Sequence, residues 1–127
     1  MADLIYPELS YKIIGTLFEV YNELGGGYQE KYYQRAIGKE LENRCIRFTE
    51  QLPIELSYKG ESLGRYFLDF LIEEKIILEI KSASKLYPRD IKQVLGYLKE
   101  KDLELGILAC FNKDKLSYKR ILKGNLR

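Results

Sequence analysis

Two neighbouring apolar stretches of this sequence each contain a single acidic residue, and the second also contains a lysine. Asp69 lies in the stretch 66–72, whose other residues are all apolar or aromatic, and Glu79 and Lys81 lie two residues apart in 76–81. A carboxylate in a buried strand costs free energy unless it is paired, and ionisable groups of this kind concentrate at working sites. We predict that the missing partner is a divalent metal ion.

The spacing also predicts how these residues meet. Residues 73–75 form a polar break with the length of a short hairpin loop. If Glu74 is the centre of that loop, Asp69 lies opposite Glu79, and Lys81 projects from the same face as Glu79. Carboxylate oxygens suit Mg²⁺, a bound ion polarises a phosphate and acidifies a water molecule, and a lysine can position that water or stabilise developing charge.

An ordinary cross-strand salt bridge on a solvated sheet face is the alternative interpretation of these residues. It would account for Glu79 and Lys81, but it leaves Asp69 unexplained among its apolar neighbours. The acid-x-Lys pattern itself is not specific, because it also occurs at residues 73–75 and 90–92.

The composition indicates one globular domain spanning residues 1–127. The chain is 46% hydrophobic and 31% charged, a balance typical of soluble domains with a real core. No apolar run approaches the roughly 18 residues of a membrane span, and the N-terminus lacks the pattern of a signal peptide. We therefore expect no membrane association and a cytoplasmic location, with Cys45 and Cys110 as reduced core thiols.

The absence of histidine restricts the possible chemistry. It excludes Ser-His-Asp and Cys-His catalysis and zinc sites built on histidine. Acid–base work must then fall to carboxylates, lysine, tyrosine or metal-bound water.

The net charge of +2 conceals an uneven distribution. Residues 1–80 carry 9 basic and 14 acidic side chains, or −5, whereas residues 81–127 carry 12 and 5, or +7. A basic surface is typical of proteins that bind a phosphate backbone, but a solvated charged face is an equally good explanation. The basic residues in question include Lys81, Lys85, Arg89, Lys92, Lys113, Lys115, Lys119, Arg120, Lys123 and Arg127.

The hydrophobic periodicity predicts a mixed sheet flanked by helices. We expect helices at 8–24, 28–44 and 88–102, and strands at 46–58 (interrupted near Pro53), around Asp69, and at 75–81, 105–111 and 116–122. The helix between strands 75–81 and 105–111 implies a crossover to a parallel partner.

Two further groups of residues complete a recognisable pattern. Gln93 and Tyr97 are four residues apart and share one helical face, and the segment 27–33 has the form Gly-x-x-Glu-x-x-Tyr, with Glu30 and Tyr33 at its fixed positions. With Asp69 and the Glu-x-Lys element, these residues make the chain resemble the GxxExxY family, a RecB-like branch of the PD-(D/E)xK nuclease superfamily. The resemblance implies a restriction-endonuclease-like α/β/α core.

The resemblance also implies a role for each site residue. Asp69, Glu79 and the Ile80 carbonyl would ligate Mg²⁺ or Mn²⁺, and Lys81 would orient the attacking water. Glu30 would support the metal directly or through water, although an acid in the first turn of a helix is favourable without any catalysis. The remaining residues implied to line the site are Gln93 and Tyr97; Tyr97, like Tyr33, is alternatively a packing residue.

The function implied by the resemblance is metal-dependent hydrolysis of phosphodiester bonds, in DNA rather than RNA by superfamily analogy. A domain this small has little surface for gripping a duplex, so we expect a homodimer or a partner protein. Two alternatives stay open. One is a non-catalytic nucleic-acid-binding module of a larger complex, and the other is a metal-dependent hydrolase of small phosphoesters, which would lack the steep salt dependence of nucleic-acid binding.

Overall fold

Three amphipathic helices supply the outer layers of the fold. The computed structural model describes residues 5–125, with α1 at Pro7–Leu24, α2 at Glu30–Asn43 and α3 at Pro88–Lys101. Each helix buries residues spaced three or four apart, such as Ile13, Leu17 and Val20 of α1, which is the stripe that a helix presents to a core. Within residues 5–125, no helix is long and apolar enough to cross a membrane.

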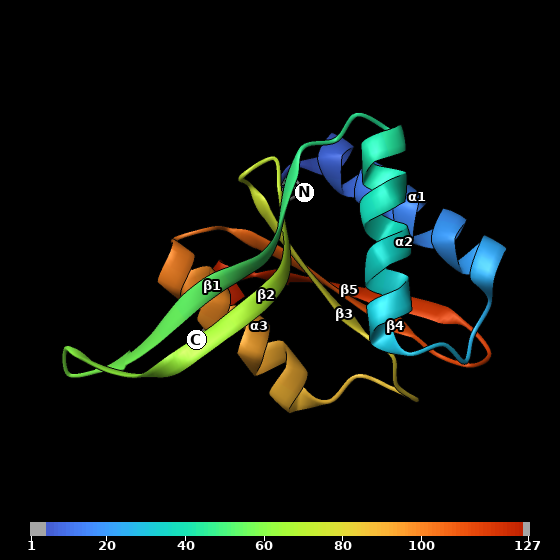
Figure 1. Ribbon diagram of the computed structural model, residues 1–127. Coiled ribbons are helices and arrows are strands. Elements are labelled where there is room, and N and C mark those ends of the chain that lie inside the picture. The colour runs from blue at the N-terminus through green and yellow to red at the C-terminus, as the bar shows by residue number, and fades with distance from the viewer. Residues whose placement is uncertain (1–4, 126–127) are drawn as a thin grey trace.

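Five strands form a single mixed sheet between these helices. The strands are β1 (Phe48–Tyr58), β2 (Glu61–Ile72), β3 (Ile76–Lys81), β4 (Leu105–Phe111) and β5 (Leu116–Leu122), and they lie side by side in sequence order. Only β3 and β4 pair in parallel, because α3 carries the chain across the sheet between them. The expected mixed α/β architecture is thus confirmed (Figure 1).

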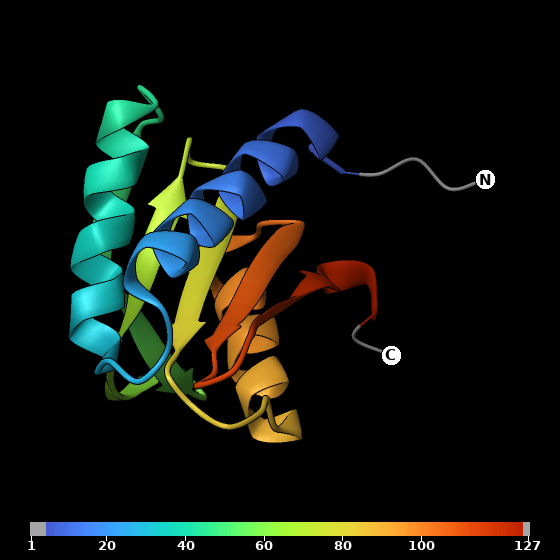
Figure 2. The same cartoon turned by 90° about the vertical axis from the view of Figure 1, so that its right-hand side faces the viewer.

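The helices divide between the two faces of the sheet, as Figure 2 shows. One buried cluster lies between the sheet and α1 with α2, and it includes Leu17, Ile37 and Leu78. The other lies between the sheet and α3, and it includes Ile77 and Leu98. The alternation of strand residues between these clusters gives the three-layer α/β/α arrangement.

The strands β1 and β2 form a long hairpin whose far end projects from the body of the molecule (Figure 1). The expected interruption near Pro53 was wrong, because β1 runs continuously through this residue and pairs it with Phe67. Proline is tolerated there because β1 is an edge strand. The irregular positions of β1 are instead Gln51, which has a φ of 50°, and the step from Leu56 to Ser57, where the register with β2 shifts.

The two cysteines have different environments. Both are free thiols, but only Cys110 is buried. Cys45 is exposed and has a φ of 58° in the turn after α2, so the expectation of a second core thiol was wrong. The adjacent Ile46 takes the buried position instead.

Candidate metal-binding and catalytic site

The strands β2 and β3 separate at Asp69. The antiparallel ladder between them contains the pairs Phe70↔Leu78, Leu71↔Ile77 and Ile72↔Ile76 and goes no further. In the predicted hairpin register the next pair would be Asp69 and Glu79, but β2 continues beyond this point alongside β1 alone. Backbone amides at such a fork lose their partners on the neighbouring strand and need other acceptors.

The two carboxylates supply these acceptors. The backbone amide of Asp69 donates to Glu79 Oε1 at 2.7 Å, and the amide of Ile80 donates to Asp69 Oδ2 at 2.8 Å. Both side chains are buried, with 7% of Asp69 and 4% of Glu79 exposed. The structure therefore brings Asp69, Glu79 and Ile80 together as the sequence predicted.

No cation neutralises this pair within residues 5–125. The Lys81 ammonium donates to Gln93 Oε1 at 3.2 Å, and none of the ion pairs in this part of the chain includes Lys81, Asp69 or Glu79. Because both acids are also buried, the alternative of a salt bridge on a solvated sheet face does not describe the structure.

Burial of two anions side by side changes their protonation. Burial, followed by the charge of Asp69, raises the pKa of Glu79 to about 8. Burial also raises the pKa of Asp69, against the opposing effects of the Ile80 amide and the Lys81 charge. The molecule thus holds a site with excess negative potential, and a bound cation would relieve it.

The loop between α1 and α2 positions Glu30 beside this pair. Gly27 has a φ of 96°, in the left-handed region that favours glycine. The buried Tyr33 hydroxyl donates to the Gly25 carbonyl at 2.6 Å and accepts from the Tyr28 amide at 3.3 Å. Tyr33 is thus a packing residue with a satisfied hydroxyl, and it fixes the loop from which α2 begins at Glu30.

Glu30 lies within electrostatic reach of the site without contacting it. Burial raises its pKa, the charge of Asp69 adds to this effect, and the Lys81 charge opposes it. A hydrogen bond of 2.7 Å from Ser82 Oγ to the Tyr28 carbonyl ties the end of β3 to the start of α2. The side chain of Glu30 makes no hydrogen bond or ion pair with another residue between 5 and 125, and its role at the metal stays a prediction.

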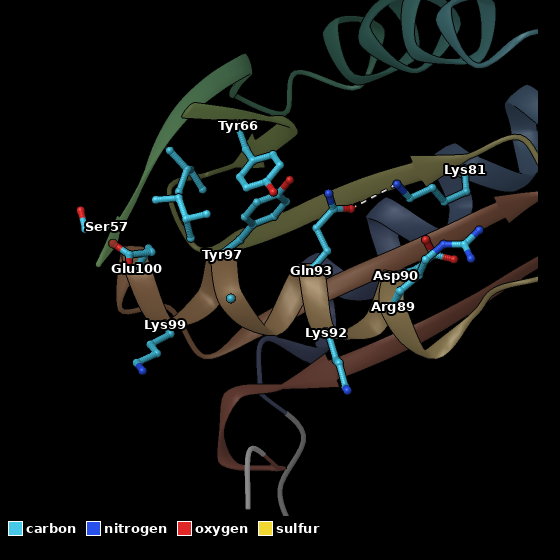
Figure 3. Close-up of a pocket in the computed structure, with 13 residues that line it drawn as sticks. Ser57, Tyr66, Lys81, Arg89, Asp90, Lys92, Gln93, Tyr97, Lys99 and Glu100 are labelled. Carbon is cyan, nitrogen blue, oxygen red and sulfur yellow. Dashed lines mark hydrogen bonds between the residues drawn. The ribbon is translucent and has the colours of Figure 1, made fainter. Parts of the chain in front are cut away.

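The predicted helical face of Gln93 and Tyr97 turns toward the same site. Figure 3 shows Gln93 extending from α3 to Lys81, with the rings of Tyr97 and Tyr66 beside each other. Their ring centroids are 6.2 Å apart. Burial, followed by the charges of Glu79 and Asp69, raises the pKa of Tyr97, so its hydroxyl remains neutral near the carboxylates.

Two glutamines that the sequence analysis missed also belong to this site. Gln34 of α2 donates from Nε2 to Asp69 Oδ1 at 2.9 Å, and Gln51 of β1 donates to Gln34 Oε1 at 3.4 Å. Gln51 has a left-handed φ of 50° opposite Asp69 in the β1–β2 register, a strained conformation of the kind that clusters at functional sites. The one available signal was the position of Gln34 one helical turn after Glu30.

The donor set fits a hard divalent cation. No hydrogen bond from residues 5–125 reaches the second oxygen of Glu79, and the N–H of Ile80 faces Asp69 rather than β4. Because the N–H and C=O of one strand residue point to the same side, the Ile80 carbonyl also faces the fork. Mg²⁺ is commonly held by one or two carboxylates and several waters.

Glu30 does not complete a three-carboxylate cage. Within the described residues, no cluster of three or more His, Cys, Asp or Glu side chains is arranged to hold a metal ion by itself. The protein ligands expected from the fork are therefore Asp69, Glu79 and the Ile80 carbonyl, and Glu30 would act through water.

The basic residues of the C-terminal third do not form one free surface. Lys123 pairs with Asp102 at 2.5 Å, and Arg120 donates to the Ile5 carbonyl at 2.6 Å. Lys113 and Lys115 are exposed in the turn between β4 and β5, and Arg127 lies outside the described residues. The remaining cations of this group near the site are Lys81, Arg89 and Lys92, beside a hollow along α3.

The comparison with protein families now agrees with this geometry. A model described as the PD-(D/E)XK nuclease superfamily matches residues 7–121. The chain belongs to the PD-(D/E)XK nuclease superfamily, which confirms the superfamily and the restriction-endonuclease-like fold expected from the sequence. No curated protein matches the chain, and its place in the GxxExxY family and the RecB-like branch stays a prediction.

Solved structures show the same fold at low sequence identity. The crystal structure of SSO0001 is 18% identical with a TM-score of 0.57, and the match covers 73% of this chain and 49% of that chain. An alkaline exonuclease (LHK-Exo) from Laribacter hongkongensis is 15% identical with a TM-score of 0.53, over 73% of this chain and 54% of that chain. The chain thus spans about half the length of both proteins.

Proposed function

We propose that this protein is a metal-dependent nuclease that hydrolyses phosphodiester bonds in DNA. The observation that carries the proposal is the pair of buried carboxylates, Asp69 and Glu79, at a strand fork where no residue between 5 and 125 forms an ion pair with them. A chain relieved of catalysis could accept the same backbone amides with neutral side-chain oxygens, whereas buried unpaired anions cost free energy. Membership of a nuclease superfamily supports the same function.

In this proposal, Asp69, Glu79 and the Ile80 carbonyl hold Mg²⁺ or Mn²⁺. The ion, when bound, would polarise the scissile phosphate and lower the pKa of the attacking water. Asp69 is oriented by the amides of Ile80 and Gln34, and Glu79 by the amide of Asp69. These contacts fix the carboxylates before any substrate arrives, as preorganised catalysis requires.

Lys81 has the position expected for the residue that orients the water. Its ammonium makes no ion pair with any residue between 5 and 125 and is held by Gln93 alone, so it stays free to donate to a water or a phosphate oxygen. Tyr97 would contribute a neutral hydroxyl, and Glu30 a water-mediated contact. We include a cytoplasmic location and a homodimer or partner protein in this proposal, and sedimentation with and without DNA tests the assembly.

The test is cleavage of linear, circular and single-stranded DNA and of RNA, with Mn²⁺, with Mg²⁺ and in chelator. We expect cleavage of DNA that requires the metal and falls by orders of magnitude in Asp69→Asn, Glu79→Gln and Lys81→Met. Activity that persists in chelator or in all three variants would contradict the proposal. Hydrolysis of nucleotides, without salt-dependent binding of oligonucleotides, would favour a small-phosphoester hydrolase instead.

A further inference from the structure

A hollow lies between the β1–β2 hairpin and α3. It has a volume of about 670 Å³ and opens onto Lys81. We propose that this hollow binds unpaired nucleotides of a single-stranded substrate, with a base stacked on Tyr66. The inference rests on the proposed function, because it identifies the substrate that enters the same site.

The hairpin side of the hollow is apolar and aromatic. Ile54 and Tyr66 form a cross-strand pair and both line it, as does Leu56, which lies opposite Gly64. Tyr66 is 46% exposed although it sits on a strand beside the core. An exposed ring in a recess offers a stacking platform, and stacking tolerates any base because every base has a flat face.

The side of the hollow formed by α3 and the end of β3 is polar and mainly cationic. Its charged side chains are Lys81, Arg89, Lys92 and Lys99 against Asp90 and Glu100, or four positive against two negative. Figure 3 shows Lys92 and Lys99 extending outward from α3, whereas the rings of Tyr66 and Tyr97 lie beside each other and Gln93 extends toward Lys81. Bases would therefore lie inside and phosphates along the basic rim.

A duplex does not fit these surfaces. Its bases are already stacked on one another, so their faces cannot reach Tyr66, and a recess with the volume of a small-molecule pocket holds one or two nucleotides. Gly96 of α3 lines the hollow, and the space beside it is open, because an added Cβ there would meet nothing within 4 Å. The hollow thus favours a strand that enters singly and delivers its next phosphate to Lys81.

The test measures binding in chelator, where no cleavage can occur, by anisotropy of a labelled oligothymidylate and of a duplex of the same length. We expect Tyr66→Ala to weaken single-strand binding by roughly 5- to 150-fold, the effect of losing one stacked base. Phe67→Ala is the matched control, because Phe67 is the neighbouring residue, is 52% exposed and does not line the hollow.

Gly96→Leu provides a second variant that fills the hollow from α3. It should weaken single-strand binding while keeping or raising the melting temperature, because glycine is a poor helix former. Equal affinity for the duplex, an equal loss in Phe67→Ala, or unchanged binding in Gly96→Leu would each overturn the inference. Metal-dependent cleavage by the wild-type protein is scored separately, so single-strand binding without cleavage would refute only the proposed nuclease activity.

Discussion

The burial of Glu79 beside Asp69 predicts an unusual dependence of stability on pH. The pKa of Glu79 is raised to about 8 from an ordinary value of 4.5. A carboxyl group whose pKa is raised in the folded protein binds its proton more tightly there than in the unfolded chain, so protonation of Glu79 favours folding. Its contribution is therefore fully present below pH 4.5 and is lost as the pH rises toward 8.

The magnitude follows from the size of this shift. Each pKa unit corresponds to about 1.4 kcal/mol. At pH 7 the unfolded chain carries Glu79 ionised and the folded protein carries it mostly protonated, so the raised pKa lowers the metal-free stability by about 3 kcal/mol relative to its value below pH 4.5, as an upper limit. For a domain of this length the loss corresponds to a melting temperature lower by about 10 °C. Glu79→Gln keeps an oxygen to accept the Asp69 amide but cannot ionise, so it should escape the loss.

The assay is thermal unfolding from pH 5 to 8.5 in chelator and with Mn²⁺. In chelator, Glu79→Gln should melt above the wild-type protein at pH 8, and the difference should shrink toward pH 5. With Mn²⁺ at about 1,000 times the dissociation constant the order should reverse at pH 7, because binding then adds about 4 kcal/mol to a protein that can bind the ion, which exceeds the loss of about 3 kcal/mol.

Glu74→Gln is the control for this comparison, because Glu74 is an exposed glutamate in the turn between the same two strands. It should leave the pH profile and the response to Mn²⁺ unchanged. Parallel pH profiles for the wild-type protein and Glu79→Gln would refute the reasoning about the buried pair. Equal stabilisation of both by Mn²⁺ would show that Glu79 is not a ligand.

Three further outcomes are expected. Lys81→Met should lower the rate of the chemical step, measured in single-turnover cleavage, by roughly 100-fold or more. The same variant should change the free energy of unfolding by less than about 1 kcal/mol, because within residues 5–125 the ammonium makes only its hydrogen bond to Gln93. Gln34→Leu should raise the dissociation constant for Mn²⁺, obtained from melting temperatures at increasing Mn²⁺ concentration, by roughly 10- to 100-fold. An unchanged dissociation constant would mean that the Asp69 carboxylate does not need the hydrogen bond from Gln34 to be oriented. Replacing Lys113, Lys115 and Lys119 with glutamine should reduce the salt slope of oligonucleotide binding by up to about 2, whereas an unchanged slope would identify this face as merely solvated.

Much of the site was predictable because it depends on a local hairpin. The symmetry about Glu74 placed Asp69 opposite Glu79, and the observed pair Phe70↔Leu78 has the same register. The shared face of Gln93 and Tyr97 followed from the period of a helix, and the shared face of Glu79 and Lys81 from the period of a strand. These features depend only on short-range geometry, which can be derived from the spacing of residues in the sequence.

The divergence of β2 from β3 was not predictable in this way. Leu68 packs in the α3-side cluster and Phe70 in the cluster on the opposite face, although they are two residues apart. The break in alternation at Asp69 depends on how the hairpin bends against α3, which is a tertiary effect. The hydrogen bond from Gln34 to Asp69 and the hydrogen bond from Gln51 to Gln34 are equally non-local, and the helical spacing of Gln34 from Glu30 does not show that they form.

The fork gives the two carboxylates a structural task as well as a chemical one. Each satisfies a backbone amide that the departing strand leaves without a partner, and an unsatisfied buried amide costs about 1–3 kcal/mol. Alanine at Asp69 or Glu79 would therefore remove a proposed metal ligand and also leave a backbone amide without an acceptor, so lost activity would not distinguish chemistry from local unfolding. The isosteric amides keep the acceptor and delete the charge. The same geometry that suggests the metal site thus dictates which substitutions can test it.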